Sequence, residues 1–552
     1  MLSALAFPRS LPHFRSLRAS SGFGLIVSGL CFPGSAFSAP PSVGSAFGLR
    51  LLGVGSKVVA AMSEVASPSS YYVEPGLLGS SLADDEATKT TKNLLKKLTP
   101  ELLQRLQAHV TQLGAVSLGS MCSGSNITSI LVANLLEVLK TGTPLHDVFS
   151  CEVDARKQEF LKYVAEWLGQ SSSHNIFSDI TEMGEHGAHC SNHDNTMCSI
   201  PPAPLIMTCG FSCKNFSKLF QSKKRTRILK NILEKGRGTT GNTCQGMLAF
   251  IRAHAPPFLI WENVPTLLEK SQKRNHAYLV KAFHEAGYAS ATGSANSIEF
   301  HLPQVRRRAY GVIVHVGKSG LGLPEASELA EKILKTKESM ASVEPVSIEE
   351  FLLERGDDYL KKQLVILKAA RQKTLRKEAS AKKLVWRKGL QAICKRRGIL
   401  YNKLKLPTKI GSAWLRALPL REQLGVALHV RSEKGLTAIE TSQAISRMSK
   451  SDANHINTIT PKGRWVLLPP MVKQSRVLTG YEKMRMQGFP DYFIRDYLAS
   501  TAGKQNGHVD RFLSELSGNA FSGPVIEAHV ISVLAHLQPR HLKDYGKVID
   551  SV

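Results

Sequence analysis

Short apolar segments alternate with longer amphipathic segments between residues 115 and 316. Apolar runs of strand character occupy residues 115–120, 147–154, 175–180, 204–210, 258–264 and 310–316. Between them, apolar positions recur at helical spacing over residues 127–140, 155–168, 245–254 and 266–286. Such alternation is typical of a mostly parallel sheet with helices on both faces. The pattern therefore predicts an α/β fold.

The segments before this region differ in character. Residues 1–63 contain no Asp or Glu and resemble a transit peptide, although translation that really begins at Met62 would explain them equally well. Residues 64–96 are expected to be a disordered linker. Thr99 and Pro100 form a good helix start, and this helix should end near Gly114.

Positive charge is concentrated after the alternating region. Residues 349–406 have a helical pattern, and residues 361–405 hold sixteen Lys or Arg and a single acid, Glu378. A solvated pair of charged helices would pair its charges internally, so this imbalance favours contact with phosphates. The formal net charge of +27 also indicates a polyanionic partner, nucleic acid ahead of membrane. No apolar run is long enough to span a membrane, and nine scattered Cys suit a reducing compartment.

Cys213 is the first candidate for chemistry. It follows the apolar run 204–210 and a Gly, which places it at the carboxyl edge of the predicted sheet. A thiol beside a cation such as Lys214 can ionise below its usual pKa and act as a nucleophile. A half-buried loop cysteine without chemistry is the alternative.

Other strand ends carry residues that suit a nucleoside ligand. The first strand leads into a turn of small residues that includes Cys122 and Gly124, the second ends at Glu152-Val153, and the third at Asp179-Ile180. An acid at the second strand tip is suited to ribose hydroxyls. Since no GxGxxG phosphate loop is present, an adenosyl ligand without pyrophosphate fits, and S-adenosylmethionine fits well. For each acid alone, a helix cap is an equal alternative.

Two later segments complete the candidate site. Glu262-Asn263 end the strand at 258–264, where a carboxyl among apolar neighbours can donate a proton or hydrogen bond to a ring nitrogen. Arg306 and Arg308 lie two residues apart in an extended segment, and paired guanidiniums suit ring oxygens and phosphates.

These motifs in this order resemble a DNA (cytosine-5) methyltransferase. The resemblance is carried by GFSCKNFS around Cys213, WENV around Glu262, QVRRR at 304–308, RVLT at 476–479 with QGFPD at 487–491, and finally Asn519-Ala520. It extends over about residues 110–540 and implies a class I S-adenosylmethionine-dependent methyltransferase fold. It further implies a catalytic domain in two parts, 97–317 and 458–552, around a target-recognition insert at 318–457.

The resemblance also implies a mechanism. Cys213 would add to carbon 6 of a cytosine flipped out of the duplex. Glu262 and Asn263 would support the ring, Arg306 and Arg308 would hold its oxygen and a neighbouring phosphate, and Lys214–Arg237, with nine cations, would be a mobile loop that closes on DNA. S-adenosylmethionine would be held by Cys122, Gly124, Glu152, Val153, Asp179, Ile180, Asn519 and Ala520.

Three features depart from this picture or lie beside it. Ser212 stands where the family usually has Pro, and Asn126 stands where a second Gly is usual, so a binding-only relative is an alternative. His186, His189, Cys190, His193 and Cys198 are zinc-competent, but their spacing matches no common zinc finger, so we expect an ordinary polar loop and no metal.

The expected partner is double-stranded DNA, with RNA as the alternative substrate. We expect a monomer in the nucleus, or in a plastid or mitochondrion if residues 1–63 are a transit peptide. The protein partners and the target sequence are not indicated by the chain.

Overall fold

The computed structural model describes residues 85–170, 174–216, 231–342, 346–380, 385–501 and 508–545. The expected leader at 1–63, most of the expected linker, and the middle of the expected loop at 214–237 lie outside these residues. All described residues belong to one unit, Glu74–Val552.

Within the described residues, nine strands form a large sheet in the order β5-β4-β3-β2-β1-β6-β7-β10-β8. Its five central strands, β3, β2, β1, β6 and β7, pair in parallel, whereas β10 runs antiparallel to both of its neighbours. The strands are β1 (Val116–Met121), β2 (Leu145–Cys151), β3 (Asn175–Phe177), β4 (Gly187–Cys190), β5 (Thr196–Ser199), β6 (Ile206–Cys209), β7 (Phe258–Asn263), β8 (Tyr288–Asn296) and β10 (Arg307–His315). The mostly parallel α/β sheet expected from the sequence is thus confirmed.

Strand β8 and the β4–β5 hairpin were not expected. Strand β8 reads Tyr-Ala-Ser-Ala-Thr-Gly-Ser-Ala-Asn, which is poor in the β-branched and aromatic residues that mark strands. Pairing with β10 and packing against a helix stabilise it, and both contacts are non-local.

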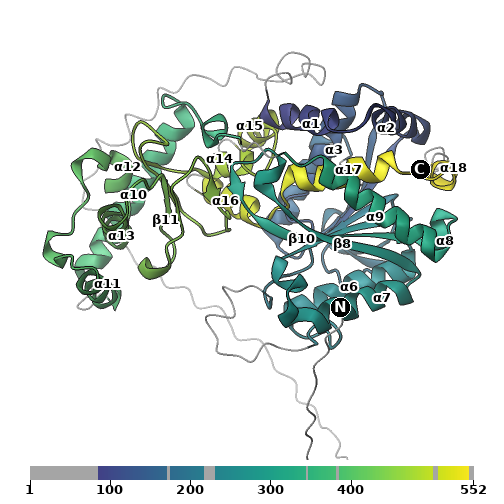
Figure 1. Ribbon diagram of the computed structural model, residues 1–552, viewed down its shortest axis with the longest axis horizontal. Coiled ribbons are helices and arrows are strands. Elements are labelled where there is room, and N and C mark those ends of the chain that lie inside the picture. The colour runs from purple at the N-terminus through teal and green to yellow at the C-terminus, as the bar shows by residue number, and fades with distance from the viewer. Residues whose placement is uncertain are drawn as a thin grey trace, which may run out of the picture. The chain divides into compact units, whose positions relative to one another are not determined.

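Helices cover both faces of the sheet, and each face has its own apolar core (Figure 1). One layer consists of α1 (Glu86–Lys96), α2 (Pro100–Leu113), α3 (Ile127–Leu139), α9 (Leu323–Ser339), α17 (Gly523–Ala535) and α18 (Pro539–Tyr545). The other contains α6 (Gly238–His254) and α7 (Lys273–Glu285). As expected, α2 begins at the Thr99 cap, whose side chain accepts from the Leu102 N–H, and it ends before Gly114. Helix α4 (Ala155–Trp167) packs in a third cluster with the segment after residue 480.

After α9 the chain builds a smaller body. Its helices are α10 (Asp358–Ser380), α11 (Val385–Arg396), α12 (Ala413–Arg416) and α13 (Leu420–Ser432). Its sheet has the order β12-β11-β14-β15, made of β11 (Ala438–Glu440), β12 (Lys450–Ser451), β14 (Trp465–Leu467) and β15 (Arg476–Val477). Strand β13 (Ile456–Asn457) pairs with β9 (Gln304–Val305) and so joins this body to the segment just before β10. Helix α8 (Val316–Ser319) precedes this body, directly after β10. Three helices follow it in the chain: α14 (Gly480–Arg485), α15 (Asp491–Ser500) and α16 (Val509–Asn519).

Packing shifts three of the expected boundaries. Residues 86–96, expected to be linker, form α1 and bury Leu94 and Leu95 in the main core. Helix α9, expected in the insert, packs on β8, β10 and α17 and belongs to the sheet domain. Strands β14 and β15, expected in the second catalytic part, complete the small sheet of the insert. A sequence pattern locates elements, but only these contacts show which core each one joins.

Among the described residues, no helix is long and apolar enough to cross a membrane.

The carboxyl ends of the parallel strands form one straight edge. Met121 of β1 is in register with Cys151 of β2 and with Cys209 of β6, while Cys151 is in register with Phe177 of β3 and Cys209 with Trp261 of β7. Residues that follow these positions are therefore brought together at the edge where α/β enzymes carry their reacting groups.

Candidate active site

Cys213 lies in the loop that follows β6, at this carboxyl edge. The loop starts at Gly210, which packs against the ring of Phe521 so closely that a Cβ there would come within 2.9 Å of a ring carbon. The Asn263 side-chain amide donates a hydrogen bond to the Phe211 carbonyl (2.9 Å) and ties the loop to the end of β7. These contacts place the half-buried Cys213 beside the tip of β7.

Ser212 and its neighbours attach the same loop to α6. The Ser212 N–H donates to Thr243 Oγ1 (3.0 Å), a bond that Pro at this position could not make. Thr243 Oγ1 in turn donates to the Thr239 carbonyl (2.9 Å). The Asn215 N–H donates to Thr240 Oγ1 (3.0 Å) in the first turn of the helix. Hydrogen bonds to α6 thus fix the turn that a proline ring would otherwise stiffen.

Thr240 and Thr243 were not among the candidate residues. They sit three positions apart near the helix start, but nothing in the sequence links them to Ser212 or Asn215. The only sequence signal for this attachment was Ser212 at a position where the family usually has Pro.

Glu262 and Arg308 form an ion pair beside Cys213. Glu262 is the penultimate residue of β7, and Arg308 lies near the start of the antiparallel neighbour β10, which places Tyr310 opposite Glu262. The Arg308 Nε lies 2.9 Å from Glu262 Oε1, and both side chains are largely buried. The carboxyl expected among apolar neighbours therefore faces a guanidinium.

The charges around Cys213 act on its thiol in opposite directions. Burial raises the pKa of Cys213, and the nearby Glu262 carboxylate raises it further. The guanidiniums of Arg308 and Arg306 lower this pKa but do not cancel the rise. The expectation that Lys214 would lower it is wrong, because Lys214 is exposed and its charge is screened by solvent.

Arg306 occupies a different position from the one expected. Its guanidinium is buried and donates to the carbonyls of Ile459 (3.1 Å), Gly518 (3.4 Å) and Ala520 (2.7 Å). Burial lowers the pKa of Arg306 to about 10. The side chain thus joins the QVRRR segment to the chain entering the insert sheet and to the end of α16.

The expected cofactor residues gather around the ends of β1, β2 and β3. Glu152 is buried, and its Oε2 accepts from the Gly124 N–H (3.0 Å) in the turn after β1. Asp179 Oδ1 accepts from the N–H and hydroxyl of Thr181. Asp179 therefore caps a turn, which resembles the helix cap named above as the alternative role of each acid. Cys122 and Gly124 both adopt positive φ.

The other expected cofactor residues differ in exposure. Val153 is 79% exposed, Ile180 is buried, and Ala520 is buried beside the exposed Asn519. An apolar side chain left open at the strand edge, next to the carboxylate of Glu152, fits the adenine and ribose of an adenosyl ligand. The donor set therefore suits S-adenosylmethionine.

Asn126, the departure from Gly, takes part in a buried polar network. Asn126 has a left-handed φ of 45°, which Asn tolerates better than most residues. Its Nδ2 donates to Asp147 Oδ2 (2.6 Å), and the imidazole of His174 is hydrogen-bonded to the Asp147 carbonyl (2.7 Å). Burial raises the pKa of Asp147. Asn126 thus keeps the turn conformation that Gly would have and adds a partner for a buried carboxyl.

Arg476 and Thr479 of the RVLT segment both bind the buried carboxylate of Glu482. Arg476 forms two hydrogen bonds with the carboxylate of Glu482, 2.9 and 2.6 Å long, and Thr479 caps α14 in a capping box with the same carboxylate. Burial opposes ionisation, yet the pairing with Arg476 gives Glu482 a pKa below its ordinary value. Glu482 Oε1 also accepts from the Leu353 N–H (2.9 Å), which anchors the chain entering the insert.

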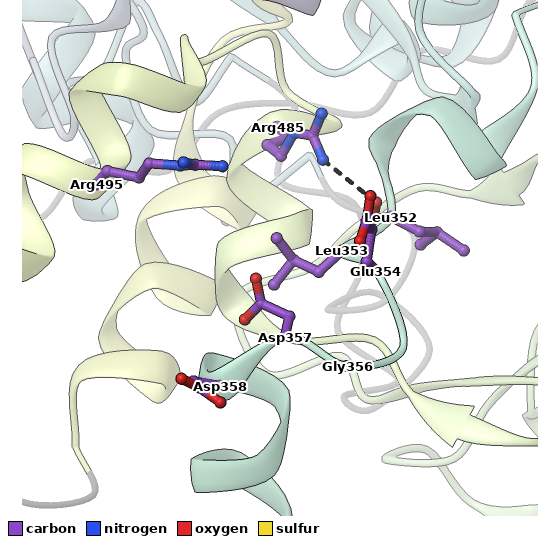
Figure 2. Close-up of a pocket in the computed structure, with 8 residues that line it drawn as sticks. All are labelled: Leu352, Leu353, Glu354, Gly356, Asp357, Asp358, Arg485 and Arg495. Carbon is purple, nitrogen blue, oxygen red and sulfur yellow. Dashed lines mark hydrogen bonds between the residues drawn. The ribbon is translucent and has the colours of Figure 1, made fainter.

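One surface pocket lies away from this site. It has a volume of about 640 Å³ and is open to solvent between the start of α10 and helices α14 and α15 (Figure 2). It is lined by Leu352, Leu353, Glu354, Gly356, Asp357, Asp358, Arg485 and Arg495. Figure 2 shows Arg485 directed to the Leu352 carbonyl, to which it donates at 3.4 Å. None of the expected catalytic residues lines it.

Fold and site together define a Rossmann-like methyltransferase of class I, with a thiol, a carboxylate and a guanidinium at the carboxyl edge of the sheet. The chain belongs to the C-5 cytosine-specific DNA methylase family, whose model matches residues 148–529.

Curated relatives include fungal and bacterial enzymes. The DNA (cytosine-5-)-methyltransferase DMT5 of Cryptococcus neoformans is 23% identical over 449 residues, which cover 75% of this chain and 17% of that protein. The Type II methyltransferase M.NgoFVII of Neisseria gonorrhoeae is 30% identical over 110 residues, or 20% of this chain and 26% of that protein. The chain thus spans only a minor part of the length of the fungal relative.

Among solved structures, the Dnmt2 methyltransferase of S. pombe matches with 15% identity and a TM-score of 0.37, covering 76% of this chain and 98% of that one.

Proposed function

We propose that this protein is a DNA cytosine-5 methyltransferase that acts through Cys213. The observation that carries the proposal is the meeting of Cys213 with the Glu262–Arg308 pair at the carboxyl edge of the sheet. A nucleophile, a hydrogen-bonding carboxyl and a cation are the three groups needed to attack and polarise a pyrimidine ring.

The residues divide the reaction between them. As the substrate binds, Glu262 takes the proton of the Cys213 thiol and passes it to ring nitrogen 3 while the sulfur adds to carbon 6 of a flipped cytosine. The exocyclic amine donates a hydrogen bond to Glu262. Asn263 holds the loop of Cys213 through Phe211, and Arg308 orients Glu262 and contacts the ring oxygen. After methyl transfer, loss of the proton at carbon 5 expels Cys213 and restores the ring. Because the pKa of Cys213 is raised in the free protein, its thiolate has to form as the substrate binds.

S-adenosylmethionine supplies the methyl group as an electrophilic sulfonium. Glu152 would hold the ribose, Val153 and Ile180 would flank the adenine, and Asp179 would contact its edge. Cys122, Gly124, Asn519 and Ala520 would line the remaining wall. Arg306, which bonds the Ala520 carbonyl, is a positioning residue for that wall in this proposal.

The insert supplies the DNA contact. On α10 and α11 the side chains of Lys362, Lys368, Lys373, Lys388 and Lys395 are exposed. Such a concentration of exposed cations suits a phosphate backbone, and binding through it should weaken steeply as salt rises.

The test is label transfer from S-adenosylmethionine to duplex DNA by the purified chain. We expect transfer by the wild type and none by Cys213→Ser. Cys244→Ser removes a buried thiol from the apolar core beneath α6 and should leave transfer undiminished. A parallel reaction with tRNA decides the RNA alternative, and transfer to neither polymer would overturn the proposal.

We further propose that the protein works in the nucleus, because its substrate class is found there. A tagged full-length chain should co-localise with nuclear DNA, and accumulation in a plastid or mitochondrion would favour a real transit peptide instead.

A further inference from the structure

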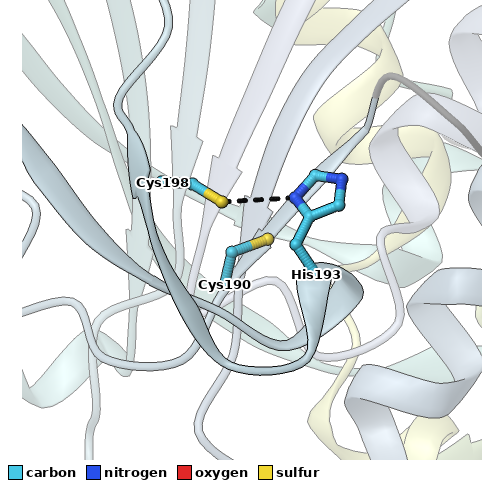
Figure 3. Close-up of side chains that lie close together, drawn as sticks. All are labelled: Cys190, His193 and Cys198. Carbon is cyan, nitrogen blue, oxygen red and sulfur yellow. Dashed lines mark hydrogen bonds between the residues drawn. The ribbon is translucent and has the colours of Figure 1, made fainter.

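The β4–β5 hairpin at the edge of the large sheet gathers two thiols and an imidazole. Cys190 ends β4, His193 lies in the connecting turn, and Cys198 lies in β5 (Figure 3). Cys190 is fully buried, whereas His193 and Cys198 are half-buried. His189, which was considered with them, is instead paired with Glu182, at 3.0 Å.

We propose that Cys190, His193 and Cys198 bind a zinc ion. Their ligand atoms all lie within 4.8 Å of one another, and Cys198 Sγ is 3.3 Å from His193 Nδ1. In a tetrahedral zinc site the sulfur and nitrogen ligands lie ~3.5 Å apart, close to this separation.

One ion can reach all three atoms with little rearrangement. Since no pair is separated by more than 4.8 Å, some point lies within about 2.8 Å of all three atoms, and small side-chain rotations bring the ion to the ~2.3 Å of a zinc–sulfur bond. Zinc displaces the proton of each thiol, so binding releases two protons.

One sulfur already has a donor. The Ile176 N–H donates to Cys190 Sγ (3.3 Å), while the Thr196 hydroxyl donates to the His193 carbonyl (2.8 Å) and so holds the turn that carries the imidazole. Outer-shell donors of this kind stabilise ligating thiolates. Within the described part of the chain, no fourth His, Cys, Asp or Glu joins the group, so water takes the fourth position.

The ion would brace the β4–β5 hairpin, which supplies all three ligands and pairs with β3. The hairpin already contacts this strand through the Ser178 N–H, which donates to the His189 carbonyl (2.8 Å), and through Ser191 Oγ, which donates to the Ile176 carbonyl (3.1 Å). Asp179 follows Ser178 directly. In this respect the inference rests on the proposed function: a hairpin fixed by zinc would steady the β3 end that faces the cofactor.

Metal analysis of the full-length chain, purified from zinc-supplemented cells, tests the proposal. We expect about one zinc per chain, and a thiolate-to-metal charge-transfer band when cobalt replaces it. Loss of an outer-shell partner costs about 10–100-fold in metal affinity, so Cys190→Ser, Cys198→Ser and His193→Ala should each cost at least that. His189→Ala and Cys244→Ser, matched in residue type but outside the cluster, should retain the metal.

The remaining outcomes are equally decisive. Chelation should lower the melting temperature of the wild type but not that of the Cys190→Ser/Cys198→Ser variant. A zinc-free wild type without a cobalt band, zinc retained in all three ligand variants, or a Cys190–Cys198 disulfide would each overturn the proposal. Because metal content is read without DNA or S-adenosylmethionine, its failure is distinguishable from failure of the methyltransferase assignment.

Discussion

The bond between Ser212 and Thr243 predicts an unusual pattern of mutational effects. Thr243→Val removes the acceptor and leaves the Ser212 N–H without its partner at 3.0 Å. An unsatisfied donor in a part-buried site costs about 1–3 kcal/mol. Ser212→Pro removes the donor itself, so it loses only the net value of one hydrogen bond, about 1 kcal/mol. Proline also restricts the unfolded chain, which offsets about 0.4–1 kcal/mol of that loss if the local backbone accepts the ring.

The two changes should therefore not be additive. In the Ser212→Pro background no N–H remains to be orphaned, so Thr243→Val should cost about 1–2 kcal/mol less than it does in the wild type. Urea denaturation of the four members of the cycle measures this coupling. Thr243→Ser keeps the hydroxyl and is the matched control.

The same cycle should appear in the rate of methyl transfer. A shift of the thiol by about 1 Å can cost ~100-fold in rate. We expect Thr243→Val to lower kcat far more than it changes KM for DNA, and Ser212→Pro to recover much of the lost rate. If Thr243→Val costs the same in both backgrounds, or costs nothing in either, the proposed attachment of the loop to α6 is refuted.

Three further predictions concern buried charge. Arg306→Met should lower the free energy of unfolding by about 3 kcal/mol because it leaves three carbonyls without their charged donor. The same change at the exposed Arg307 should have little effect. Equal effects of the two changes in urea denaturation would contradict the position assigned to Arg306. Since the pKa of Cys213 is raised, its alkylation by iodoacetamide should reach half the maximal rate at a pH above ~8.5, the pKa of a free thiol. In Glu262→Gln this midpoint should move to lower pH. A wild-type midpoint below the pKa of a free thiol would refute the electrostatic account of Cys213. Burial raises the pKa of Glu527 to about 8 from 4.5, so the unfolded chain loses this proton first and stability falls as pH rises from about 4.5 to about 8. Glu527→Gln should flatten that decline, by up to a few kcal/mol at the upper end. If the variant shows the same decrease of stability with pH as the wild type, Glu527 is not a buried neutral carboxyl.

The sequence predicts the central sheet well because the parallel strands are short, mostly apolar segments, and the helices between them have clear periodicity. Strand β8 escapes this reasoning since it consists mostly of small residues and is held by pairing with β10 and by packing against α9, both of which come later in the chain. The boundaries of the insert are missed for a related reason. Helix α9 and strands β14 and β15 look alike in either domain, and only their packing assigns them.

The candidate site shows the same division. Cys213 is found from its place just after a strand and Glu262 from its place at the end of one, because parallel strands end at one edge. The sequence cannot show that Arg306 turns to three carbonyls whereas Arg308, two residues later, turns to Glu262. It also gives the wrong sign for the pKa of Cys213, since burial and the Glu262 charge depend on the folded neighbours.

The central claim is that Cys213 is a nucleophile towards cytosine, and duplex DNA containing 5-fluorocytosine tests it most directly. With S-adenosylmethionine present, fluorine at carbon 5 prevents the release step, so the account predicts a denaturation-resistant protein–DNA adduct. Mass spectrometry should map this adduct to Cys213, and Cys213→Ser should form none. A chain that binds both DNA and S-adenosylmethionine yet forms no adduct, or that forms it through another residue, would contradict the account.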